Sequence, residues 1–585
     1  MSRKLKVIVA VVLASIVAIA PGIRGQQTGV VVVEGATLID GTGAGAVSNS
    51  VIVIQNGRIT AVGPRSRVQI PAGARVVNAR GKWAIPGIID GHVHYEPWNG
   101  ELFVNGGVTT IFDFGNEVPW IFEVRDAERS GKVKNMPRIY LAGQNINRPG
   151  GNALPSFGVN AGTPAGPAPA NAPQGAEWAL NTVKARIALG IDLVKVSADN
   201  LTAEEIKAIT DEAHKANLKV VGHVTDIHKY LDNGFDGVVH LWGVSMTLMT
   251  PENRKKFAEE GAIMNPYAYM DPAKIDPLVK YMVDKGASLM PLLASEHSGV
   301  TGRVEAFKAA AARMYMNPEL RYVPLKAVLS NQAILNRNRS FSKTVGGFPY
   351  VSMMTPAELD EARRGYKAAL DFTAKFARAG GRLFLGTDGP GTVPGMGIRH
   401  EIQLLVDAGL SPMQAIQAAT KNTAELHNKG DQVGTLQVGR WGDVVLLDGD
   451  PLRDIANIDR ISQVIKAGEV LEMRYHRNYR PAFWNRPEHD DYDNSRVNVV
   501  PVLTTVTVEP GAGGATTIVA KGRGFYDVSN IYLNNLRLDT NLVHIEELRA
   551  TLPADQKPAA GPYNITVRTP WPGGGISEAK PLTLD

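Results

Sequence analysis

Short apolar runs alternate with helical patterns through residues 84–430. An apolar run bounded by turn residues is typical of a buried strand, and apolar residues at every third or fourth position are typical of a helix. Eight runs have the strand pattern, at residues 85–89, 108–114, 138–142, 191–196, 218–221, 237–239, 287–293 and 382–385. The alternation predicts an α/β fold, and the count predicts a (β/α)8 TIM barrel over residues 84–430. A ninth run at 262–267 leaves the assignment around the seventh strand open.

Capping residues mark where several helices begin. Ser or Thr stands three residues before Glu or Gln at Thr202 and Glu205, Thr355 and Glu358, and Ser411 and Gln414. In this capping box, each side chain accepts a hydrogen bond from the backbone N–H of the other residue. The helix after Thr355 should bury the face formed by Leu359, Ala362, Tyr366, Ala369, Phe372 and Phe376.

The segments on either side of the predicted barrel have β character. Residues 29–79 alternate β-rich runs with turns, among them the hairpin signal Asn56-Gly57. Residues 434–474 have the same character, so we predict a small composite β-sandwich built from residues 26–83 and 431–480. After a linker at 481–497, residues 498–585 alternate apolar and polar positions and predict an all-β, immunoglobulin-like domain.

Two insertions interrupt the barrel pattern, at 147–174 after the third strand and at 296–354 after the seventh. In a barrel, the loops that follow strands lie at the catalytic face. Long loops in this position usually serve as lids or pocket walls. The second insertion has a largely helical pattern.

The first 25 residues read as a secretory signal peptide, because Arg3, Lys4 and Lys6 precede an apolar run. The run is short for a membrane-spanning helix, so cleavage and a periplasmic or secreted location are expected, with an uncleaved anchor as the alternative. Removing the leader lowers the formal net charge from +5 to near +1. Nothing in the charge pattern indicates nucleic-acid binding. The chain has no cysteine, which excludes disulfides and thiolate metal sites.

Polar residues stand at the ends of the predicted strands. His92 and His94 close the first strand at positions i and i+2, so both imidazoles point to one side. The other strand-end residues are Lys195, His223, His240 and Asp388. A lysine within an apolar strand would bury a charge, which is costly unless the amine is neutralised or modified. Because strand ends meet at one mouth of a barrel, this set is a candidate metal centre.

The motifs around these residues resemble the metal-dependent amidohydrolase superfamily, and its imidazolonepropionase-like and prolidase-like members in particular. They are Pro-Gly-Ile-Ile-Asp-Gly-His-Val-His at 86–94, Gly-Val-Thr-Thr at 107–110, Asp-Leu-Val-Lys-Val at 192–196, His-Val-Thr-Asp at 223–226, the run at 234–240 ending in His240, and Gly-Thr-Asp at 386–388. The resemblance covers residues 29–474. A weaker similarity links Gly-Arg-Gly-Phe at 522–525, Gly-Pro-Tyr at 561–563 and Gly-Gly-Gly-Ile-Ser at 573–577 to the IPT/TIG module.

The resemblance implies two divalent ions, often zinc. In this scheme one ion is held by His92, His94 and Asp388, the other by His223 and His240, and Lys195 bridges them as a carbamate. Catalysis would use a metal-activated hydroxide, with Asp388 as proton shuttle. A mononuclear site in which His240 only hydrogen-bonds the water stays open.

The substrate does not follow from the resemblance. Phe112 stands where many relatives carry arginine, and Asn152 where relatives often have histidine, so pocket positions differ. Asn152, Tyr267, His297 and His228 are candidate substrate contacts. The first hypothesis is an exported hydrolase of a C–N bond in a small amide, dipeptide or cyclic amide.

Three alternatives remain. A heterocycle deaminase or an esterase would use the same site, and an inactive surface-binding protein would act through its terminal domain. That domain is also a candidate surface for contact with another protein, and a homo-oligomer stays open.

Overall fold

The computed structural model describes residues 29–584, apart from gaps at 117, 147–173, 198–200, 261–264, 325–326, 329–330, 332–334, 336–350, 352–353, 390–391, 480–500, 526–528, 545 and 570–574. The predicted leader, the linker at 481–497 and Asn152 lie outside the described residues. Among the helices that are described, none is both long enough and apolar enough to cross a membrane.

Eight parallel strands form the centre of residues 84–430, in two sheets. They are β7 (Ile88–Val93), β8 (Val108–Asp113) and β9 (Arg138–Leu141) in one sheet, and β10 (Val194–Val196), β11 (Val220–Gly222), β12 (Gly237–Val239), β13 (Ser288–Met290) and β14 (Arg382–Leu383) in the other. Single parallel bridges join Ile146 to Val196 and Val93 to Gly389. One bridge therefore connects the β9 edge of the first sheet to β10, and the other connects the β7 edge to the chain that follows β14.

Each of the eight predicted runs overlaps one of these strands, although most of the bounds differ. The run at 287–293 ends as a strand at Met290, because a helix begins at Leu293. The ninth candidate run, at 262–267, forms no strand in its described residues, 265–267. Its last residues enter a 3-10 helix, Pro266–Tyr269, and proline lacks the N–H that a sheet ladder needs.

Helices follow most of the strands. They are α1 (Gly100–Asn105), α2 (Trp120–Arg129), α3 (Ala176–Ala188), α4 (Ala203–Lys215), α5 (Ile227–Asp232), α6 (Trp242–Leu248), α7 (Pro251–Glu260), α8 (Pro272–Asp284), α9 (Leu293–His297), α10 (Val304–Tyr315), α12 (Pro356–Arg378), α13 (Gly397–Asp407), α14 (Pro412–Gln417) and α15 (Thr423–Leu426). All three predicted capping boxes are present, at the starts of α4, α12 and α14. The predicted face of α12 is buried except for Leu359, which is half-buried.

The chain before the first barrel strand contributes to two sheets, and the second of them also contains strands that follow the barrel. One contains β4 (Arg58–Pro64), β3 (Ser50–Gln55), β1 (Val30–Glu34) and β5 (Arg75–Asn78). The other contains β17 (Glu469–Val470), β16 (Ile461–Lys466), β15 (Val444–Leu447), β6 (Trp83–Pro86) and β2 (Thr37–Leu38). The antiparallel pairing of β15 with β6 agrees with the prediction that late strands complete the early β unit. Side chains from both sheets share one apolar core.

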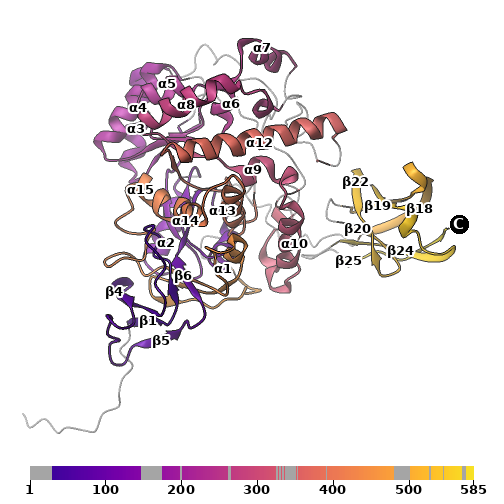
Figure 1. The fold of residues 1–585 in the computed structure, drawn as a ribbon, viewed down its shortest axis with the longest axis horizontal. Coiled ribbons are helices and arrows are strands. Elements are labelled where there is room, and N and C mark those ends of the chain that lie inside the picture. Colours follow the sequence, from indigo (N-terminus) through magenta and orange to yellow (C-terminus); the bar gives the residue numbers. More distant parts are fainter. Residues whose placement is uncertain are drawn as a thin grey trace, which may run out of the picture.

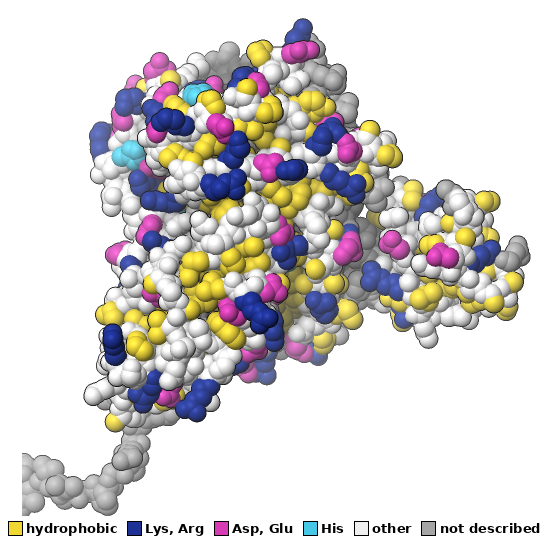
Figure 2. Space-filling view, viewed as in Figure 1, with side chains coloured by type: hydrophobic (Ala, Val, Ile, Leu, Met, Phe, Trp, Pro, Cys, Tyr) yellow, Lys and Arg dark blue, Asp and Glu magenta, His cyan; other side chains and the backbone are white. Residues whose placement is uncertain are grey.

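The C-terminal residues form two further sheets around a core of their own. One holds β18 (Val502–Pro510), β19 (Thr516–Arg523), β23 (Glu547–Leu552) and β22 (Thr540–His544), and the other holds β21 (Leu536–Arg537), β20 (Asn530–Leu533), β24 (Gly561–Thr569), β25 (Gly575–Ile576) and β26 (Lys580–Leu584). In Figure 1 these strands form a separate group on the side of α10. On the face drawn in Figure 2, basic and acidic side chains of the described residues are interspersed over the surface.

A buried ion pair ties the barrel to the composite β unit. Arg138, at the start of β9, lies 2.5 Å from Asp443 Oδ2, and the Ala467 N–H donates to Asp443 Oδ1 at 2.7 Å. Both charged side chains are less than a tenth exposed. Because removing one partner leaves an unpaired buried charge, the pair should matter far more than a surface pair.

We predict that Asp443→Ala lowers the free energy of unfolding of the catalytic region by about 3–5 kcal/mol. The matched control is Asp448→Ala, which breaks the exposed ion pair with Lys82; it should cost no more than about 1 kcal/mol. Urea unfolding followed by tryptophan fluorescence measures both. Equal losses in the two variants would contradict the assigned role of Asp443.

Candidate metal centre

His92 and His94 meet Asp388 at the end of β7. Asp388 Oδ1 lies 3.3 Å from His92 Nε2 and 3.5 Å from His94 Nε2. One donor atom from each residue lies within 4.8 Å of the others. His92 and Asp388 are buried, and the His94 side chain is 15% exposed. The three side chains therefore form a candidate metal-binding group.

A backbone contact sets the orientation of His94. Its Nδ1–H donates to the carbonyl oxygen of Gly115 at 2.7 Å. Because a carbonyl can only accept, Nδ1 carries the hydrogen, and Nε2 is left on the side of Asp388. A hydrogen bond at the far nitrogen is the usual way in which proteins hold a metal-binding histidine.

Lys195 lies within the apolar interior on β10 and is 2% exposed. Its Nζ has no hydrogen-bond partner among the described residues and lies 5.1 Å from the centre of the Phe114 ring. Burial lowers the pKa of Lys195 to about 7, although the charge of Asp388 acts in the opposite direction. A large fraction of this amine is thus neutral near pH 7.

His223 and His240 complete the cluster. Their ring centres are 4.9 Å apart, and His240 Nε2 lies 3.8 Å from Asp388 Oδ2. Burial, followed by the nearby Lys195, holds the pKa of His223 well below its usual value. The structure therefore brings together all six residues that the sequence proposed as ligands.

Two of these residues have unusual backbone conformations. His240 has φ 65° and Asp388 has φ 53°, in the left-handed region that non-glycine residues seldom adopt. Backbone hydrogen bonds hold the turn at Asp388. The N–H groups of Thr387 and Asp388 both donate to the His92 carbonyl, at 3.1 and 2.8 Å. Strain of this kind is concentrated at functional sites.

Three residues that contact the cluster were not singled out from the sequence. Phe114 stacks on His92 with ring centres 4.5 Å apart, and Glu296 Oε1 accepts a hydrogen bond from His240 Nδ1 at 2.9 Å. Asp90 accepts from the Thr387 N–H at 3.0 Å. Asp90 lies within the histidine motif and could have been noticed there, whereas the contact of Glu296 joins residues 56 positions apart and left no local signal.

The candidate substrate contacts have different surroundings. Tyr267 and His297 are both buried, with ring centres 5.0 Å apart, and His297 follows directly after Glu296. Burial lowers the pKa of His297 to about 4, so the ring is neutral at pH 7. His228, by contrast, is exposed on α5, with its ring 4.4 Å from that of Tyr281 on α8.

Phe112, which the sequence analysis placed at a pocket position, lies within the apolar interior. Its ring centre lies 5.1 Å from that of Tyr140 and 4.3 Å from that of His427. Phe114, two residues later on the same side of the chain, is the one that reaches His92 and Lys195.

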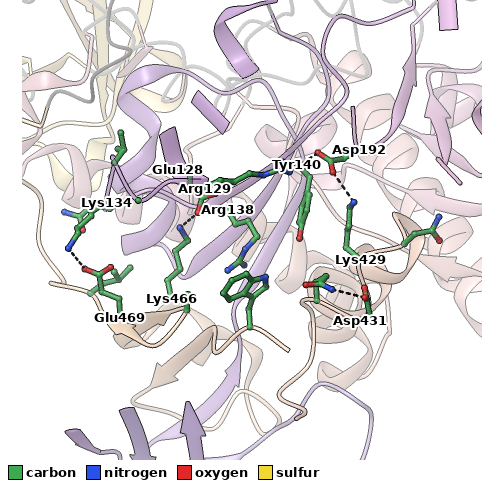
Figure 3. Close-up of a pocket in the computed structure, with 18 residues that line it drawn as sticks. Glu128, Arg129, Lys134, Arg138, Tyr140, Asp192, Lys429, Asp431, Lys466 and Glu469 are labelled. Carbon is green, nitrogen blue, oxygen red and sulfur yellow. Dashed lines mark hydrogen bonds and ion pairs between the residues drawn. The ribbon is translucent and has the colours of Figure 1, made fainter. Parts of the chain in front are cut away.

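Figure 3 shows residues that line a cleft of about 690 Å³. Arg138 and Tyr140 from β9 are among its lining residues, whereas none of the six candidate ligands lines it. Each basic side chain in the lining has an acidic partner; the pairs are Arg129–Asp192, Lys134–Glu469, Arg138–Asp443, Lys429–Asp192 and Lys466–Glu128. The cleft therefore lies between the barrel and the composite β unit, and the charges of its basic side chains are balanced by acidic partners.

Residues 83–471 match the model of the amidohydrolase family. The chain belongs to the amidohydrolase family. The family resemblance inferred from the motifs is thus confirmed, and the candidate histidine and aspartate group agrees with the general metal dependence of that family.

Curated relatives match over short stretches. The allantoinase of Solibacter usitatus (strain Ellin6076) is 37% identical over 122 residues, which cover 19% of this chain and 25% of that protein. The imidazolonepropionase of Geobacillus sp. (strain WCH70) is 34% identical over 102 residues, which cover 17% of this chain and 24% of that protein. This chain therefore spans only about a quarter of the length of these relatives.

Solved structures match over a much larger part. A Xaa-Pro dipeptidase with bound methionine aligns with TM-score 0.52 and 21% identity, covering 76% of this chain and 100% of its own. Molinate hydrolase aligns with TM-score 0.54 and 20% identity, covering 76% of this chain and 95% of its own. At these identities the likeness establishes the amidohydrolase fold.

We predict that His94→Ala weakens binding of a divalent ion by more than the roughly 10–100-fold that is typical when a supporting residue is lost. The control is His214→Ala, which removes a partly exposed imidazole that pairs with Asp236. Competition with a chromogenic chelator measures the affinity of both variants. Unchanged affinity in His94→Ala would exclude this residue as a ligand.

Proposed function

We propose that the amidohydrolase-family chain is a metal-dependent hydrolase that cleaves a C–N bond in a small amide, dipeptide or cyclic amide. The observation that carries the proposal is the convergence of Asp388 with His92, His94 and His240 around one buried point. A carboxylate beside several imidazoles provides both metal ligands and a proton carrier.

The residues present fit a binuclear centre. The buried nitrogens His92 Nε2, His240 Nε2 and Lys195 Nζ have no hydrogen-bond partner among the described residues, which is expensive unless a ligand satisfies them. His92, His94 and Asp388 would hold one ion, and His223 and His240 the other. Imidazole and carboxylate donors suit zinc. Bound divalent ions would polarise the substrate carbonyl and lower the pKa of water towards about 7.

Lys195 would bridge the two ions as a carbamate. Its lowered pKa supports this proposal, because only the neutral amine has the lone pair that attacks CO₂. The nitrogen forms a bond to the carbon of CO₂ and loses a proton to solvent. An amine that is costly to charge in this interior then becomes an anionic oxygen donor suited to divalent ions.

Asp388 would accept the proton of the attacking water and deliver it to the leaving nitrogen. Its position near His92, His94 and His240 keeps the carboxylate at the reacting centre. Phe114 stacks on one face of the His92 ring and would keep bulk water from that face. The products would be a carboxylic acid and an amine.

A mononuclear site remains the second arrangement. The hydrogen bond between His240 Nδ1 and Glu296 would then orient His240 as a hydrogen-bond partner of the attacking water. Metal stoichiometry separates the two arrangements.

Several further expectations from the sequence stay proposals. A closed barrel is supported by the bridges Ile146–Val196 and Val93–Gly389. An immunoglobulin-like, IPT/TIG-type terminal domain is supported by its two sheets and separate core. Signal-directed export to the periplasm or exterior, the domain boundaries and contact with a protein partner rest on sequence patterns alone.

A defined substrate panel tests the reaction. We predict that zinc-loaded protein releases acid and amine from at least one class among dipeptides, N-acyl amino acids and cyclic amides, measured by mass spectrometry. Ammonia release from a heterocycle, or ester cleavage alone, would replace this proposal by the corresponding alternative. Lack of any tightly bound divalent ion would remove its metal centre and leave the binding-protein alternative.

We predict that Lys195→Ala abolishes hydrolysis and that a short carboxylic acid, such as propionate, partly restores it by entering the space left by the side chain. The control is Lys219→Ala, which removes a partly exposed amine paired with Asp236 and should leave the rate near that of the wild type. Steady-state rates with and without propionate provide the measurement. Full activity in Lys195→Ala would exclude a bridging carbamate.

A further inference from the structure

A second buried carboxylate organises the segment that contacts His240. Glu401, on α13, is fully buried. Its Oε1 accepts from the Leu293 N–H at 2.8 Å and its Oε2 from the Ala294 N–H at 2.6 Å. Each carboxylate oxygen of Glu401 thus binds one backbone amide that is more than a hundred residues away in the sequence.

Those two amides are the first of the short helix α9. The residue before them, Leu292, has φ 55° and provides no side-chain cap. The left-handed conformation is disfavoured for leucine, and the first N–H groups of a helix need acceptors from elsewhere. Glu401 supplies these acceptors, so it fixes both the turn at Leu292 and the start of α9.

The same short helix bears Glu296. Its carboxylate accepts the hydrogen bond from His240 Nδ1 at 2.9 Å, and His240 itself has the uncommon φ of 65°. With Nδ1 held in this way, Nε2 is directed to the side on which Asp388 Oδ2 lies 3.8 Å away. A displacement of α9 would therefore be transmitted to the orientation of the imidazole.

We propose that Glu401 is a positioning residue that sets the orientation of the His240 ring by anchoring α9 and, through it, Glu296. The proposal deepens the proposed function, because it assigns a support to one side of the same centre. It also makes a claim about the metal-free protein that stands without the proposed reaction.

The chain contains a matched control for this role. Glu205, at the start of α4, is also fully buried, and its two oxygens accept from the Gly175 and Thr202 N–H groups at 2.6 and 2.8 Å. Glu205→Gln removes the same kind of acceptor as Glu401→Gln. It affects the start of α4, whereas Glu296 lies on α9.

The decisive readout is the magnetic resonance of His240 in metal-free protein with ¹³C- and ¹⁵N-labelled histidine, assigned with His240→Ala. The comparison is made at pH 8, because burial raises the pKa of Glu401 to about 7. We expect Glu401→Gln and Glu296→Gln each to shift the His240 ring signals, and Glu205→Gln to leave them in place. An unchanged His240 signal in Glu401→Gln would overturn the proposal.

A double-variant comparison tests the path through Glu296. If Glu401 acts through Glu296, adding Glu401→Gln to Glu296→Gln should produce little further shift of the His240 signals. If the shift in the double variant equals the sum of the shifts in the two single variants, the path through Glu296 is overturned. If Glu401→Gln does not fold, as judged by circular dichroism, Glu401→Asp is compared in its place, since it keeps both oxygens but shortens their reach and should shift the same signals.

Metal affinity provides an independent readout. We expect Glu401→Gln to weaken zinc binding by about 10–100-fold while Glu205→Gln leaves it unchanged. Wild-type affinity in Glu401→Gln would show that the displaced ring does not serve a metal. If the wild-type protein binds no zinc, the proposed function loses its metal centre, whereas the resonance comparison still decides the role of Glu401.

Discussion

The site depends on keeping a carboxylate and several imidazoles together in a buried position. Asp388 is 2% exposed, and its oxygens face His92, His94 and His240 at 3.3 to 3.8 Å. In such surroundings charges interact strongly, and every unsatisfied polar atom is costly. The fold meets this constraint by supplying the groups from separate strand ends, so that no single segment has to hold them all. Asp90 then holds the backbone turn before Asp388, and Glu296 holds the ring of His240.

Features encoded within a few residues could be predicted from the sequence. The capping boxes at α4, α12 and α14 depend on side chains three positions apart, so their pattern is sufficient. The candidate ligands could be found because each follows an apolar run, and parallel strands bring such positions to one end. The pairing of β15 with β6 was also foreseeable, because a short β unit without a closed core requires further strands.

Other features depend on how deep a side chain lies in the interior and on contacts between segments that are far apart in the sequence. Neither can be read from the local sequence. Phe112 and Phe114 occupy equivalent positions along β8 and beyond it, but only Phe114 lies at the level of His92. Sequence spacing gives the side of a strand, but it does not give the layer within the interior. The contacts of Glu296 with His240 and of Glu401 with α9 join distant segments, and nothing in their local sequence names the partner.

The junction between β15 and β6 has a consequence for the order of folding. β6 lies one residue before β7, the strand that leads to His92 and His94, and its antiparallel partner belongs to the late part of the chain. The nearby pair Lys82 and Asp448 closes a loop of 366 residues. Contacts this distant form slowly, because the chain must lose much of its freedom before they contribute. β6, which directly precedes the first ligand strand, can thus gain its antiparallel partner only after nearly all of residues 83–447 have been synthesised, so chains interrupted before Val444 would lack the strand that secures the segment leading into β7.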